Sequence, residues 1–243
     1  MAAGMIVLYG VAAQRVEVVG NGDGGWIAAR AGRPGVVIAA PHGDSDPRTG
    51  AMAAELGRRT GFGLVVATGF ALQIDARGVP VRRYQVNRPL EGAPGRPPSE
   101  EVASDNARRV YEAYEHRVRD VAQGPLRFYA EIHGNNREAA AGRIEIATVG
   151  VDHAQALGLR TLLEAIRDTH LGEHPEAIRL HVRVEPVDVV VYTASGAKRA
   201  GILRLPERGV HIELPRAARS HGQAVYTAIL ADFLSQAAAP PPR

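Results

Sequence analysis

Histidines and carboxylates directly follow two apolar runs of this sequence, in positions suited to binding a metal ion. The run at 36–40 leads into the segment PHGDSD at 41–46, and the run at 128–132 leads into His133. Two imidazoles and one carboxylate leave the fourth position of a tetrahedral zinc ion open, which is the arrangement of catalytic rather than structural sites. His42, an acid of the first segment and His133 are therefore candidate metal ligands.

Two further segments carry polar groups suited to substrate binding and proton transfer. In RRYQVNRP at 82–89, the forked guanidinium of Arg88 can hold a carboxylate through two hydrogen bonds, with Asn87 adding a donor beside it. In GVHIELP at 209–215 the apolar residues alternate, so His211 and Glu213 face the other side of a strand. Glu213 is then placed to act on a water molecule at the metal. The alternative for Glu213 is a half-exposed strand residue paired with Arg216 or Arg219.

Short β-branched runs alternate with segments of helical periodicity along the chain. The predicted strands are 5–9, 36–40, 64–67, 128–132, 143–149, 178–184, 189–192 and 210–214. The predicted helices are 49–60, 100–121, 154–168 and one after His221. Strict alternation at 143–146 and 179–183 indicates strands with one wet face, and the apolar runs at 36 and 189 indicate central strands. This interleaving favours a three-layer α/β/α sandwich with a mixed, mainly parallel central sheet, of the phosphorylase/hydrolase-like kind.

The length of 243 residues suffices for one sizeable core. Because no linker or internal repeat divides the chain, we expect a single domain over 1–236, followed by a disordered tail at 237–243. The segment 90–99, rich in proline and glycine, indicates a long loop of the type that often borders a functional site.

Composition narrows the classes of function. The absence of Cys excludes disulfides, thiolate metal sites and a cysteine nucleophile. The net charge of +3, from 29 basic and 26 acidic residues, indicates no basic surface for nucleic acid. The N-terminus lacks the basic region of a signal peptide, and no run approaches the ~20 apolar residues of a membrane span. We therefore expect a cytoplasmic protein without nucleic-acid or membrane partners.

The order of these motifs resembles the zinc carboxypeptidase-like superfamily. Within it, the short length and the PHG start are similar to the N-formylglutamate amidohydrolases and the phage poly-γ-glutamate hydrolases, over roughly residues 36–215. The resemblance implies a Zn²⁺ cofactor and a substrate carboxylate anchored by Asn87 and Arg88. It also implies that Arg83 or Arg82 polarises the scissile carbonyl, and that Glu213 is the general base and then the general acid.

The sequence departs from the family pattern at the metal-binding acid. The usual position, three residues after the first His, is Ser45, which leaves Asp44 and Asp46 as candidates. We prefer Asp46, because the poly-γ-glutamate hydrolases place their acid further from the His, before a Pro-x-Thr turn. The other aspartate would then cap the helix near residue 49. Glu131 matches an acid that the family places two residues before the later His, and its role in orienting His133 stays open.

These features predict a zinc-dependent hydrolase that cleaves an amide bond in a small substrate with a free carboxylate, similar to N-formylglutamate amidohydrolase. Alternatives are a metallo-carboxypeptidase, a γ-glutamyl hydrolase acting on a polymer, and a non-catalytic binding protein on the same scaffold. The remaining histidines are assigned structural roles; His211 and His221 are placed to line the site but receive no function.

Overall fold

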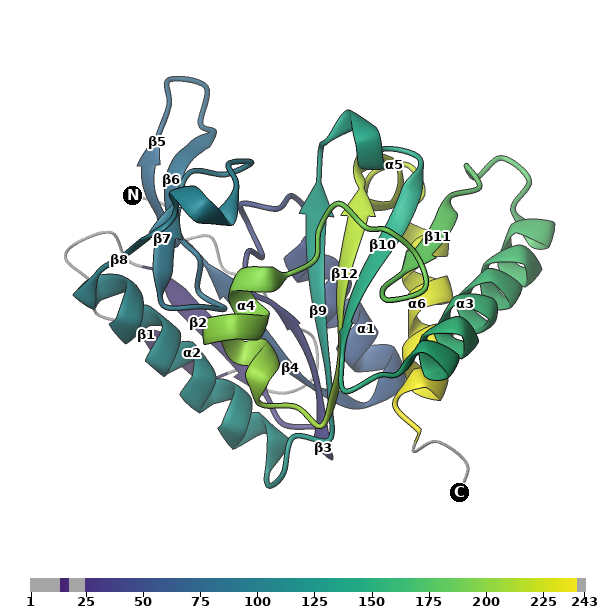
Figure 1. Cartoon of the computed structure of the whole chain (residues 1–243), viewed down its shortest axis with the longest axis horizontal. Helices are drawn as coiled ribbons and strands as arrows, with labels where there is room; N and C mark the ends of the chain where they lie inside the picture. The colour runs from purple at the N-terminus through teal and green to yellow at the C-terminus, as the bar shows by residue number, and fades with distance from the viewer. Residues whose placement is uncertain (1–13, 18–24, 240–243) are drawn as a thin grey trace.

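The computed structural model describes residues 14–17 and 25–239 (Figure 1). The predicted strand at 5–9 lies outside these residues, as do residues 240–243 of the predicted tail. An eight-stranded sheet forms the centre of the described structure, in the order β1-β2-β4-β3-β9-β12-β10-β11. Its strands are β1 (Gln14–Glu17), β2 (Trp26–Arg30), β3 (Arg33–Ala40), β4 (Phe62–Thr68), β9 (Phe128–Asn135), β10 (Arg143–Val149), β11 (His181–Val184) and β12 (Arg208–Pro215).

The sheet is mixed, as the sequence predicts. Among the described strands, β4, β3, β9 and β12 are mutually parallel neighbours, and β10 pairs with β11 in parallel. The pairs β1–β2, β2–β4 and β10–β12 are antiparallel. Because β3, β9 and β12 run in the same direction side by side, the residues that follow or end these strands meet at one edge of the sheet.

Helices cover both faces of this sheet, which confirms the three-layer α/β sandwich (Figure 1). One face packs against α1 (Thr49–Thr60), α3 (His153–Glu173) and α6 (Gln223–Ala237), and the other against α2 (Asp105–Ala122) and α4 (Ser195–Ala200). Alternation in β12 sends Val210, Ile212 and Leu214 into the first core, so His211 and Glu213 face the side of α2 and α4.

A second, four-stranded antiparallel sheet lies between β4 and α2 in the chain. It consists of β5 (Ala71–Ile74), β6 (Pro80–Tyr84), β7 (Leu90–Gly92) and β8 (Val102–Ala103). Short helical turns, η1 (Pro98–Glu100), η2 (Glu138–Ala140), η3 (Ile202–Arg204) and α5 (Arg216–Arg219), complete the described elements. The loop predicted at 90–99 therefore begins with β7 and continues through the turn that carries η1.

The predicted helix 100–121 begins only at residue 105 and the predicted strand 178–184 only at residue 181. Three further sequence predictions need correction. Residues 189–192 form no strand, and Val189 is 92% exposed, because this segment turns over the end of β10. Glu145 in β10 is fully buried rather than wet, since its carboxylate accepts the backbone N–H groups of Val191 and Tyr192. Ala237, placed in the tail, ends α6 and is buried. Across the described residues, the helices lack the length and apolar character needed to cross a membrane.

Candidate metal centre

The turn after β3 places His42 and Asp46 on the same side of the chain. The N–H of Asp46 donates to the carbonyl of His42 at 2.8 Å, which closes the turn. Gly43 donates to the carbonyl of Ala67 at 2.8 Å, and a Cβ at this position would lie 2.6 Å from a methyl carbon of Val66. Only glycine fits so close to β4. The turn is therefore held against the neighbouring strand, with both polar side chains at the strand ends.

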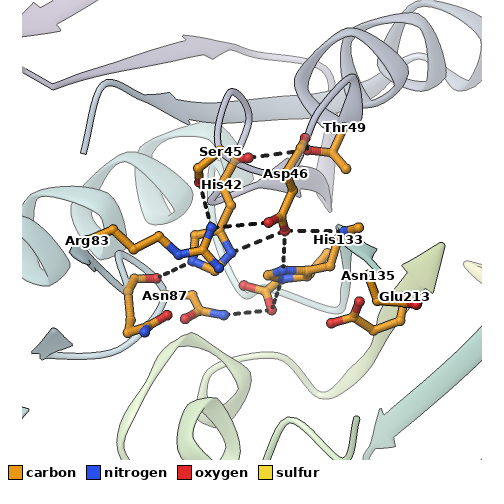
Figure 2. Close-up of polar contacts among 12 residues, drawn as sticks. His42, Ser45, Asp46, Thr49, Arg83, Asn87, His133, Asn135 and Glu213 are labelled. Carbon is orange, nitrogen blue, oxygen red and sulfur yellow. Dashed lines mark hydrogen bonds and ion pairs between the residues drawn. The ribbon is translucent and has the colours of Figure 1, made fainter. Parts of the chain in front are cut away.

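The side chains of His42, Asp46 and His133 converge on one point (Figure 2). Nδ1 of His42 and Nδ1 of His133 each lie 3.4 Å from Oδ2 of Asp46, and all three residues are buried. Ligand bonds of about 2.0–2.2 Å around a tetrahedral ion place the ligand atoms roughly 3.3–3.6 Å apart. The observed separations match this spacing, so these residues fit a metal ion.

Each imidazole is oriented through its other nitrogen. Nε2 of His42 lies 3.1 Å from the carbonyl of Gln85, so the N–H at Nε2 leaves the Nδ1 lone pair directed at Asp46. This Nδ1 is buried and has no hydrogen-bond partner among the described residues. Nε2 of His133 lies 3.4 Å from Oε2 of Glu131. An outer carboxylate that fixes a ligand histidine is the usual arrangement in metal sites, and Glu131 occupies that position.

Burial and neighbouring charges set the protonation of the group in the absence of metal. Burial, with the positive charge of Arg83, lowers the pKa of His42 to about 3. Burial also opposes charge on His133, but hydrogen bonds to Asp46 and Glu131 outweigh it and raise the pKa of His133 to about 10. Burial raises the pKa of Asp46, but the charge of His42, hydrogen bonds with both histidines and the charge of Arg83 outweigh it and hold this pKa well below its usual range. Without metal, the group therefore holds one proton on His133.

We expect metal binding to displace this proton. His133 must offer a free lone pair, so about one proton leaves the protein per metal bound at pH 7. Between pH 6 and 9, below the pKa of about 10, the apparent affinity should rise by up to about tenfold per pH unit, because the competing proton becomes scarcer. Calorimetric titration in buffers of different ionisation enthalpy measures the released protons. An affinity independent of pH over this range would contradict the charge assignment.

The structure separates the candidates that the sequence left open. Asp44 is exposed, and its carboxylate accepts the N–H of Gly69 at 2.7 Å, as a turn residue does. Neither aspartate caps α1, because its N-cap residue is Arg48, which makes no side-chain capping bond. Arg82 pairs with Glu91 at 2.7 Å, away from the metal group. Of the two aspartates, the structure places Asp46 beside His42 and His133.

Arg83 comes from β6 in the second sheet and reaches the metal group (Figure 2). Its Nη1 lies 3.1 Å from Oδ1 of Asp46 and donates to the hydroxyl of Ser45 at 2.6 Å. Oδ1 thus contacts Arg83 while Oδ2 faces the histidines. The guanidinium is largely buried and borders the cleft described below.

The structure corrects the expected free donors at Asn87 and Arg88. Asn87 is fully buried; its amide nitrogen donates to Glu131 at 3.2 Å, and its amide oxygen accepts from Arg88 at 2.9 Å. Arg88 holds Glu101 with Nε at 2.7 Å and with Nη2. Arg88 still borders the cleft, but a carboxylate of the protein itself already occupies its fork.

The structure excludes the alternative of a half-exposed Glu213, since the residue is 6% exposed. Oε1 lies 3.2 Å from Nε2 of His211, and Oε2 is buried without a hydrogen-bond partner in the described part of the chain. Arg219, an alternative partner for Glu213, instead donates to the backbone carbonyls of Leu214, Pro47 and Asn135. Glu213 lines the cleft described below, and Oε2 is its carboxylate oxygen without a partner in the described residues.

One cleft of about 640 Å³ is lined by the metal group and by Arg83, Arg88 and Glu213. Its walls come from the turn after β3, from 93–98, from 133–137 and from 191–196, and they include His211 and Glu101. Sequence reasoning gave these two residues no function. For His211, the alternation with Glu213 along the strand was a signal in the sequence. For Glu101, the sequence held no signal of its pairing with Arg88. Tyr192 stands at the rim, where the guanidinium carbon of Arg137 lies 5.1 Å from its ring centre.

No protein-family model and no curated protein sequence matches the chain. Among solved structures, a gene product of Agrobacterium tumefaciens is 15% identical, with a TM-score of 0.50 over 87% of this chain and 92% of that chain. A bacteriophage poly-gamma-glutamate hydrolase is 12% identical, with a TM-score of 0.47 over 90% of each chain. A metallo-carboxypeptidase from Burkholderia cenocepacia is 12% identical, with a TM-score of 0.43 over 95% of this chain and 66% of that chain. At 15% identity, the Agrobacterium tumefaciens match concerns the fold alone.

Proposed function

We propose that this chain is a zinc-dependent hydrolase that cleaves an amide bond in a small substrate carrying a carboxylate, of the N-formylglutamate amidohydrolase type. The observation that carries the proposal is the convergence of His42, Asp46 and His133 at ligand spacing in the cleft that Glu213 also lines. The cleft volume of about 640 Å³ suits a small molecule better than a folded protein.

The donor set supports zinc as the metal. Two imidazoles and one carboxylate suit zinc, whereas magnesium and calcium prefer oxygen ligands throughout. Three protein ligands also leave an open position, as catalytic zinc sites do. Zinc bound there would act as a Lewis acid and lower the pKa of a water molecule toward ~7.

Glu213 and Arg83 would then have separate roles in the hydrolysis. Oε2 of Glu213 takes a proton from the attacking water, whose oxygen forms a bond to the amide carbon. The guanidinium of Arg83 stabilises the negative charge that develops on the carbonyl oxygen. Glu213 returns the proton to the leaving nitrogen as the C–N bond breaks. The products are a carboxylic acid and an amine, so one water is consumed.

The substrate class depends on Arg88. A substrate carboxylate must share or displace Glu101 in the fork of Arg88, because Nε and Nη2 are already engaged. The side chains of this ion pair are 14% and 4% exposed, so a carboxylate entering from the cleft meets Arg88 more readily than Glu101. We therefore assign Arg88 to carboxylate recognition and Glu101 to holding it in place before substrate arrives.

Arg88→Ala should raise KM for a carboxylate-bearing substrate such as N-formylglutamate roughly ten- to a hundredfold, and change KM little for its neutral amide analogue. A charge-assisted bidentate contact contributes about 1.5–3 kcal/mol, which gives this range. The assay uses protein stripped of metal with a chelator and reloaded with zinc, so the metal requirement is measured with the same preparation.

Arg77→Ala is the matched control, because Arg77 is exposed on the β5–β6 hairpin and pairs with Asp75. Equal losses on the charged substrate and its amide analogue would show that Arg88 only supports the protein through Glu101. Hydrolysis that persists fully in the stripped protein would exclude the zinc-dependent reaction itself. Activity confined to γ-glutamyl oligomers or peptides would assign the chain to one of the alternative substrate classes.

A further inference from the structure

His211 lies between two buried carboxylates on the floor of the cleft. Its Nδ1 is 3.0 Å from Oε2 of Glu131, and its Nε2 is 3.2 Å from Oε1 of Glu213. The strand register explains the arrangement, because His211 in β12 stands directly beside Glu131 in β9, and Glu213 stands beside His133. Each ring nitrogen of His211 therefore faces a different carboxylate.

Glu131 is itself held on several sides. Its Oε1 accepts the hydroxyl of Tyr129 at 3.0 Å, and this hydroxyl lies 2.9 Å from that of Tyr114 in α2. Its Oε2 accepts the amide of Asn87 at 3.2 Å. Glu131 and both tyrosines are fully buried. Its position is thus fixed by Tyr129 and Asn87, and through Tyr129 by Tyr114 in α2.

The other end of this chain of contacts is the carboxylate proposed as general base. Glu213 has three side-chain torsions, and its Oε2 has no hydrogen-bond partner in the described structure. Glu213 lines the cleft, and the contact to His211 is what holds its Oε1. A shift of about 1 Å at a catalytic group can cost ~10²-fold in rate, so this contact matters to the reaction.

We propose that His211 is a positioning residue: it fixes the carboxylate of Glu213 through Nε2 and is oriented in turn by Glu131 through Nδ1. The proposal rests on the proposed hydrolytic function for its kinetic consequence, but the position of Glu213 tests it independently. The alternative is that Glu131, His133 and His211 bind a metal ion, since their ligand atoms also converge. We favour positioning, because Oε2 of Glu131 already accepts the hydrogen bond of Asn87.

Two amide substitutions separate the two contacts of His211. In His211→Gln the side-chain nitrogen reaches the place of Nε2 and can still donate to Glu213. In His211→Asn it reaches only the place of Nδ1, so the contact to Glu131 is kept and the contact to Glu213 is lost. Both variants keep a polar side chain beside the buried carboxylate of Glu131. The matched control is His181→Asn, because His181 lies on the exposed side of β11.

In crystal structures, the carboxylate of Glu213 should keep its wild-type position in the Gln variant and leave it in the Asn variant. The Asn variant should lose at least about tenfold in kcat with little change in KM, and the Gln variant should retain most of its activity. Zinc content should equal that of the wild type in both. Combined with Glu213→Gln, the Asn substitution should cost no further rate, because its effect passes through Glu213.

An unmoved Glu213 carboxylate in the Asn variant would overturn the positioning role, and so would a full additional loss of rate in the Glu213→Gln background. Loss of zinc from both His211 variants would assign His211 to the metal instead. If the wild type binds no metal and hydrolyses nothing, the proposed function fails, while the crystallographic comparison still decides whether His211 positions Glu213. A variant that does not fold is replaced by the other, since each predicts a different position for Glu213.

Discussion

Glu213→Gln is expected to give a folded, zinc-loaded protein whose turnover is at least about 10²–10⁴-fold lower than that of the wild type. The amide has the shape of the carboxylate but cannot take a proton from water. Oε1 can still accept from His211, so the side chain should keep its place. KM should change little, because a general base acts mainly in the transition state.

The measurement is kcat from initial rates, together with zinc content and the thermal unfolding midpoint of the same samples. Glu207→Gln is the matched control, since Glu207 is exposed just before β12 begins at residue 208. A Gln variant that holds zinc and turns over at a rate near the wild type would remove Glu213 from the mechanism. The chain would then lose its candidate for proton transfer.

His42→Ala and His133→Ala are each expected to weaken zinc binding by more than the ~10–100-fold typical of outer-shell substitutions, and to abolish zinc-dependent turnover at ordinary zinc concentrations. Each change removes one of three protein ligands, and two ligands form a much weaker chelate. His133→Ala should also remove the proton that the metal-free group holds, because His133 carries this proton between Asp46 and Glu131.

Competition with a chromogenic chelator gives the affinities, and elemental analysis gives the occupancy. His116→Ala is the matched control, because the side chain of His116 is 71% exposed on α2. Full zinc occupancy in both variants would show that these imidazoles do not hold the metal. A loss confined to His133→Ala would instead favour the group formed by Glu131, His133 and His211.

The sequence predicts the inner sheet well, because its signals are local. Apolar runs bounded by turn residues correspond to β3, β4, β9 and β12, and helical periodicity gives α1 at its observed bounds. The prediction at 189–192 was wrong, because β-branched residues also occur in loops, and here the loop is tied down by Glu145 from another strand. The second sheet was missed, since its strands are short and its register is irregular.

In the candidate site, too, the sequence predicts the features that have local signals and misses those that depend on distant contacts. Ligand types and strand ends suffice to bring His42 and His133 together, because parallel neighbours end at the same edge of the sheet. The sequence preference for Asp46 depended on a resemblance, and its contacts with both histidines come from the turn geometry. The pairing of Arg88 with Glu101 lies beyond sequence reasoning, since it depends on the path of the rim between residues that are thirteen apart.

The central claim is that His42, Asp46 and His133 bind a catalytic zinc ion, and an anomalous-scattering map of zinc-grown crystals at the zinc absorption edge tests it most directly. The account predicts a strong peak at about 2.0–2.2 Å from Nδ1 of His42, Nδ1 of His133 and Oδ2 of Asp46, with an open position toward Glu213 and the cleft. No peak at this point under zinc-replete conditions, or a peak between Glu131 and His211 instead, would contradict it.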